Sequence, residues 1–84
     1  MNIIKGTVVI SKAGRDKGEC LAVIGTDAVR LLVCNGKDRP LENPKSKNPA
    51  HIEVTGTVLP PEAFRGNRAL KKALSLCGGK SEVQ

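Results

Sequence analysis

Residues 8–25 read VVISKAGRDKGECLAVIG, and this stretch decides the fold. Two apolar runs flank a short loop, Lys12 to Gly18, that contains glycine and carries positive charge. Aliphatic, β-branched runs of about 4–8 residues bounded by glycine are typical of strands. Gly14 and Gly18 allow the backbone to turn sharply or to approach another molecule closely. The stretch therefore predicts a hairpin whose loop presents Lys12, Arg15 and Lys17, either as a binding surface or as a merely solvated turn.

Similar runs continue along the chain and indicate a small all-β domain. The predicted strands are Gly6–Ser11, Glu19–Thr26, Val29–Cys34, Arg39–Glu42 and Ile52–Val58. We expect a turn near Gly25, and a two-residue hairpin turn at Asn35-Gly36, because Asn-Gly suits two positions with positive φ. The connections leave no room for crossover helices, and closure of such a set into a five-stranded barrel removes exposed edges.

The C-terminal part predicts a helical appendage, so we divide the chain into a barrel over 1–59 and an appendage over 60–84. Pro61 suits the first position of a helical turn, and Asn67 suits the N-cap of a helix through Leu76. Gly78-Gly79 is a natural stop, and the last five residues should fray. The helix would have an apolar face made of Leu70, Ala73, Leu74 and Cys77. The nearly all-apolar strand Val29–Cys34 is typical of a strand buried on both faces, and it is our candidate for the surface that this helix covers.

Several blocks of the chain, in order, resemble a known family. They are residues 13–18, Asn35-Gly36-Lys37, residues 39–42 and residues 44–51. These blocks look like the KOW-type large-subunit ribosomal proteins of archaea and eukaryotes and their small bacterial relatives, over about residues 6–51 and weakly over 67–74. The resemblance implies an SH3-like (KOW) barrel, ribosomal RNA as partner and a place in the translation apparatus. Gly18 would be the motif's required glycine, whereas Glu19 and Cys20 depart from the bulkier or more basic residues common there.

Charge points to nucleic acid independently of the resemblance. The formal net charge is +6 and the pI is about 9.6, which is the electrostatic footprint expected of a nucleic-acid binder. Between Glu42 and Ile52, Pro44 and Pro49 stiffen a second basic loop, and we expect it to present Lys45 and Lys47 outward, near the first loop. The lysines of this loop could instead serve only solubility.

We interpret the basic loops as a surface for structured RNA, recognised through its phosphates and 2′-hydroxyls. Asp16 is expected to orient Arg15 or to cap the loop backbone. His51 is as readily structural as a contact residue. The candidate RNA-binding residues are Lys12, Arg15, Lys17, Arg39, Lys45, Lys47, Asn48 and His51, with Gly14 and Gly18 shaping the first loop.

Other classes of function lack the residues they need. Phe64 is the single aromatic residue, so base-stacking platforms and aromatic peptide grooves are excluded. Three cysteines without zinc-site spacing predict reduced thiols. We expect no enzyme, cofactor, metal, small-molecule substrate, leader or membrane span, and a cytoplasmic monomer. The alternative function is a protein–protein adaptor that docks on the ribosome or on RNA polymerase through the apolar surface of the tail.

Overall fold

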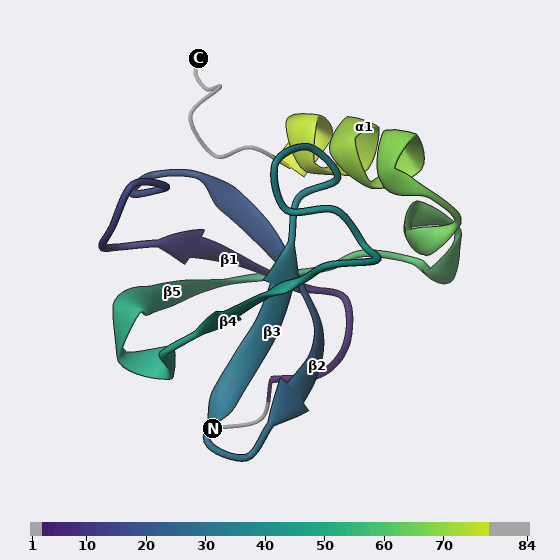
Figure 1. The fold of residues 1–84 in the computed structure, drawn as a ribbon. Helices are drawn as coiled ribbons and strands as arrows, with labels where there is room; N and C mark the ends of the chain where they lie inside the picture. The colour runs from purple at the N-terminus through teal and green to yellow at the C-terminus, as the bar shows by residue number, and fades with distance from the viewer. Residues whose placement is uncertain (1–2, 78–84) are drawn as a thin grey trace.

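The computed structural model describes residues 3–77 and shows a mainly β protein with one C-terminal helix (Figure 1). The elements are β1 (Thr7–Ser11), β2 (Cys20–Asp27), β3 (Arg30–Cys34), β4 (Lys45–Lys47), the 3₁₀ turn η1 (Pro49–His51), β5 (Ile52–Val58), the 3₁₀ turn η2 (Pro61–Phe64) and α1 (Asn67–Cys77).

The strands form a single antiparallel sheet in the order β4-β3-β2-β1-β5. The predicted strands at residues 6–11, 19–26, 29–34 and 52–58 are confirmed within one residue at each end. The predicted strand over residues 39–42 is wrong, because that segment lies in a long connection and β4 forms at Lys45–Lys47 instead. The predicted stiff loop after Glu42 therefore contains a sheet strand and a 3₁₀ turn.

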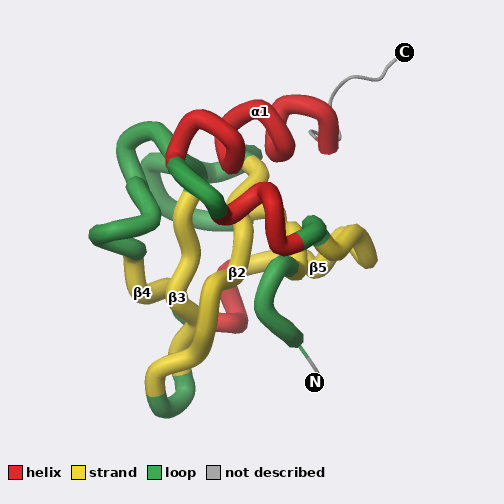
Figure 2. The backbone as a smooth tube through the Cα atoms, turned by 90° about the vertical axis from the view of Figure 1, so that its right-hand side faces the viewer, coloured by secondary structure: helices red, strands yellow, loops and turns green. Residues whose placement is uncertain are grey.

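One face of the sheet is covered by η2 and α1. Alternation along the strands places Val8, Ala22 and Cys34 on this face, where they form one buried cluster with Leu70 and Leu74 of the helix. Figure 2 shows α1 lying across the end of the sheet where β2 begins and β3 ends. The expected docking of the helix on the sheet is thus confirmed, but it spans three strands rather than only the β3 strand.

The opposite face has its own buried cluster, which includes Val9, Leu21, Val23, Val33 and Ile52. No helix contributes to this cluster among residues 3–77. Side chains on an uncovered flat sheet would remain in water, so their burial requires the sheet to bend over them. The strand register shifts between Thr7 and Val9 and between Val23 and Gly25, and breaks in register of the β-bulge kind increase strand twist and bending.

The Asn35-Gly36 turn forms, but not as a two-residue hairpin. The Asn35 Oδ1 atom accepts hydrogen bonds from the backbone N–H groups of Lys37 and Arg39, so Asn35 organises a wider loop. Gly36 has a φ of +78°, and a Cβ at this position would lie 2.3 Å from the Asn67 carbonyl oxygen. This loop therefore packs directly on the first turn of α1, at a position where only glycine fits.

Asn67 begins α1 but is not its N-cap. Its Oδ1 atom accepts a hydrogen bond from the Leu41 N–H at 2.6 Å, and its Nδ2 atom donates to Glu42 Oε1 at 2.7 Å. The side chain is consequently used to tie the β3–β4 connection to the helix. The predicted start of η2 at Pro61 is confirmed. The predicted roles of the Cys77 side chain, Gly78-Gly79 and the last five residues fall outside the described residues.

Two of the cysteines are free thiols. Cys20 is half-buried and Cys34 is fully buried in the cluster under α1, and burial raises the pKa of Cys34 to about 11. Over residues 3–77 the structure has no helix long and apolar enough to cross a membrane.

Candidate nucleic-acid interface

The loop between β1 and β2, residues 12–19, is here called the basic loop. Its backbone is tightly bonded: the Gly18 N–H donates to the Ser11 carbonyl at 2.8 Å, and the Glu19 N–H donates to the Asp16 carbonyl at 2.9 Å. Gly14 and Gly18 have φ values of +88° and +90°, in the left-handed region that favours glycine. Gly18 thus allows the sharp turn that the sequence indicates, and close packing does not require glycine there, because a Cβ would meet nothing within 4 Å.

A buried ion pair fixes the basic loop to β4. Lys47 Nζ lies 2.9 Å from Asp16 Oδ1, and the two side chains are 7% and 9% exposed. Lys47 Nζ also donates to the Ala13 carbonyl at 3.0 Å, and Asp16 Oδ1 accepts from the Ser11 hydroxyl at 2.7 Å. The predicted outward presentation of Lys47 is therefore wrong, and so is the expected pairing of Asp16 with Arg15.

The ion pair decides the ionisation of Asp16. Burial by itself raises the pKa of the Asp16 carboxyl, but hydrogen bonds from Lys47 and Ser11 and the positive charges of Lys47 and Lys45 outweigh it, so the pKa lies below its ordinary value. Asp16 Oδ2 is buried without a hydrogen-bond donor among the described residues. The free-energy cost of burying this carboxylate is consequently offset by the contacts of Oδ1.

The three cations of the basic loop, Lys12, Arg15 and Lys17, are all exposed. None of them forms an ion pair with a carboxylate in the part of the chain that the structure describes. The acidic residue in their midst, Asp16, is turned inward and balanced by Lys47. The second acidic residue of the loop, Glu19, is exposed, so the loop presents three cations and one carboxylate to the solvent.

His51 lies beside this loop. The Lys12 N–H donates to the His51 carbonyl at 2.8 Å, which joins the start of the basic loop to η1, and the His51 side chain is exposed. Asn48 has a structural task, because its Oδ1 atom caps η1 by accepting from the Ala50 N–H at 2.9 Å. Lys45 is half-buried in β4. The two predicted basic segments thus meet, as expected, although Lys47 makes the contact from inside.

Arg39 lies apart from this group, in the connection between β3 and β4. Its carbonyl accepts hydrogen bonds from the Asn35 and Gly36 N–H groups, and its side chain is half-buried. Asn35 Nδ2 donates to Asp38 Oδ1 at 2.9 Å, so an acidic residue accompanies this cation. No backbone or side-chain hydrogen bond between described residues connects this loop to the basic loop.

Sequence reasoning missed Ser11 and the true role of Asp16. A serine as the last residue of a buried strand, followed five residues later by an aspartate, is a weak signal, and the decisive partner, Lys47, is 31 residues from Asp16. Among the described residues, no group of three or more His, Cys, Asp and Glu side chains is placed to hold a metal ion.

A scan against protein-family models and a search of curated proteins found no match for this chain.

Proposed function

We propose that this protein binds structured RNA, ribosomal RNA in the first place, and acts in the translation apparatus. The contact surface is the basic loop with Lys12, Arg15 and Lys17, extended by His51 and Lys45 from the neighbouring β4–β5 segment. Asn48 supports η1 within this surface. Arg39 would contribute from the β3–β4 connection, where RNA extends that far.

The observation that carries the proposal is the segregation of charge in the basic loop. Lys47 neutralises Asp16 inside the protein, and the three loop cations remain in solvent with a single exposed carboxylate, Glu19, beside them. Phosphate binding releases condensed counterions and supplies most of the sequence-independent affinity for nucleic acid. A loop with bonded backbone and a buried anchor also loses little conformational entropy on binding, which leaves more of that free energy as affinity.

We further propose that the five strands form a small SH3-like barrel of the KOW type. The burial of the second apolar cluster without a covering helix among residues 3–77 supports this. The contact of Lys47, on the edge strand β4, with the loop that follows β1 supports it as well, because it brings one edge of the sheet toward the other. In such a barrel the basic loop would stand at one rim, as the resemblance to the KOW family implies.

The experiment is ultraviolet crosslinking in cells, followed by sequencing of the attached RNA. We expect recovery of structured RNA, with ribosomal RNA enriched, and crosslinked peptides from the basic loop and η1. The Lys12→Glu/Lys17→Glu variant should lose this RNA. A matched Lys71→Glu/Lys72→Glu variant, with the same net charge but its changes on α1, should retain it. Recovery of no RNA above background would overturn the proposal.

A further inference from the structure

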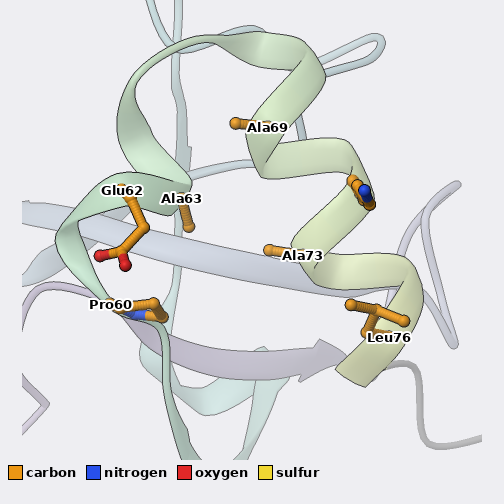
Figure 3. A pocket seen from close by; sticks show the side chains of 7 residues that line it. Pro60, Glu62, Ala63, Ala69, Ala73 and Leu76 are labelled. Atoms are coloured by element: carbon orange, nitrogen blue, oxygen red, sulfur yellow. The ribbon is translucent and has the colours of Figure 1, made fainter.

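A second surface lies between η2 and α1. Here a groove of about 250 Å³ is lined by Pro60, Ala63, Ala69, Ala73 and Leu76, with Glu62 and Lys72 as its charged members. Figure 3 shows Ala69 and Ala73 of α1 pointing across the groove toward η2, with Ala63 on the opposite wall and Leu76 at one end. The walls are therefore mostly alkyl.

Leu76 is the most conspicuous residue of this groove. Its side chain is 79% exposed, although the same helix buries Leu70 and Leu74 against the sheet. The helix therefore packs one apolar face on the protein and carries a second apolar strip, in which Ala69 and Ala73 are half-buried and Leu76 is exposed. Leu76 is continuous with the alkyl walls of the groove, and contiguous exposed apolar surface, rather than a single exposed side chain, marks an interaction site.

The exposed charges near the groove indicate which kind of partner fits it. Residues 60–77 carry four exposed cations and one exposed carboxylate, and none of these cations forms an ion pair with a carboxylate among the described residues. The cations are Arg65, Arg68, Lys71 and Lys72, and the carboxylate is Glu62. Of these charged residues only Lys72 and Glu62 line the groove, so an occupant with apolar side chains for the groove and acidic side chains for the cations beyond it complements both properties.

Two other occupants match the surface less well. A second copy of this chain would bring the cationic α1 of one molecule against that of another, and the like charges would repel. RNA would contact the cations through its phosphates, but it would offer no apolar groups to the alkyl walls formed by Ala69, Ala73 and Leu76. In Figure 1 the basic loop lies at the left of the molecule and α1 at the upper right, so the groove and the proposed RNA surface are formed by different elements.

We infer that the groove between η2 and α1 docks an acidic protein segment with an apolar face. Helix-in-groove recognition uses apolar anchors spaced along one face of the docking peptide, and the line of Ala69, Ala73 and Leu76 offers matching positions on the receiving side. Surface charges around the groove speed the encounter and favour acidic over basic partners. Through this surface the protein would connect RNA to a protein partner, in the manner of an adaptor.

The test uses the full chain and a fluorescein-labelled amphipathic peptide of leucine and glutamate, read by fluorescence anisotropy. The control peptide carries lysine in place of glutamate. The acidic peptide should bind and the lysine peptide should not. Leu76→Gln should weaken binding about five- to ten-fold, a loss of about 1–1.4 kcal/mol. Val29→Gln changes an apolar residue of similar exposure, 82%, in the β2–β3 turn, and it should leave binding unchanged.

The charge variants separate this inference from the RNA proposal. Lys71→Glu/Lys72→Glu should abolish peptide binding and retain RNA binding, and Lys12→Glu/Lys17→Glu should do the reverse. Backbone amide shifts in an NMR titration should map to residues 60–76. The inference is overturned if the acidic peptide fails to bind, if Leu76→Gln binds it as well as the wild type does, or if the amide shifts map to the basic loop. It is also overturned if Leu76→Gln weakens RNA binding instead, or dissolves a dimer seen by sedimentation.

Discussion

Replacing Lys47 with methionine should destabilise the protein severely, because it leaves the Asp16 carboxylate buried without its counterion. The two side chains are 7% and 9% exposed, so water cannot take the place of the ammonium group. Breaking a buried pair by removing one partner costs about 3–5 kcal/mol. A chain of 84 residues has a total stability of about 4–13 kcal/mol, at about 0.05–0.15 kcal/mol per residue. The variant should therefore lose a large share of its free energy of unfolding.

Chemical denaturation measures this loss, and far-UV circular dichroism must report it because the chain has no Trp or Tyr for fluorescence. Lys45→Met is the matched control, since Lys45 lies in the same strand, is half-buried and forms no ion pair within residues 3–77. It should cost less than about 1 kcal/mol. The double variant Asp16→Asn/Lys47→Met should be more stable than Lys47→Met alone, because it has no buried charge left to solvate.

The pH dependence of stability should change sign between the wild type and Lys47→Met. In the wild type the pKa of Asp16 lies below its ordinary value of 3.8, so the unfolded chain binds this proton at higher pH than the folded chain does. The stabilisation is complete above the unfolded pKa and is lost as the pH falls through the folded pKa. Without Lys47, burial dominates and raises the folded pKa, so acidification should stabilise the variant relative to neutral pH. A Lys47→Met protein that loses less than about 1 kcal/mol and keeps the wild-type pH trend would refute the reasoning.

Three further predictions follow from the fold. Gly36→Ala should lower the melting temperature far more than Gly18→Ala does, because both positions have positive φ but only a Cβ at Gly36 meets backbone, 2.3 Å from the Asn67 carbonyl oxygen; equal effects in thermal melts would contradict the packing of this loop on α1. Asn67→Ala should cost about 1–3 kcal/mol, since the Leu41 N–H loses its acceptor, and hydrogen exchange at Leu41 should accelerate; unchanged exchange would exclude the tie. Cys34, with a pKa raised to about 11 by burial, should resist alkylation at neutral pH until the protein unfolds, as mass spectrometry of labelled peptides can check; rapid labelling in native buffer would show that the cluster under α1 opens.

Much of the fold could be predicted because four strands carry their own apolar pattern. The strand β4 could not, since Lys-Ser-Lys between two prolines has no apolar residue, and its place is decided by pairing with β3. Arg39–Glu42 has a more strand-like composition, but the Asn35 and Asn67 side chains hold its backbone in a connection instead.

The exposed cations of the candidate site could be predicted from the sequence, but its buried ion pair could not. The sequence places Lys12, Arg15 and Lys17 in a glycine-shaped loop, and all three are exposed there. It gives no local sign that Lys47 differs from Lys45, because burial of Lys47 depends on Asp16, far away along the chain. Lys47, which the sequence predicts to bind phosphate, therefore anchors the loop that carries the other cations.

The salt dependence of binding to a ribosomal RNA fragment tests the central claim most directly. Each phosphate contact contributes about 0.7–0.9 to the slope of log affinity against log salt. The Lys12→Glu/Lys17→Glu variant should bind more weakly than the wild type, with a slope shallower by at least about 1.4 for its two lost contacts. The Lys71→Glu/Lys72→Glu variant should keep the wild-type slope. Equal slopes for wild type and the loop variant, or a loss confined to the helix variant, would contradict RNA binding by the basic loop.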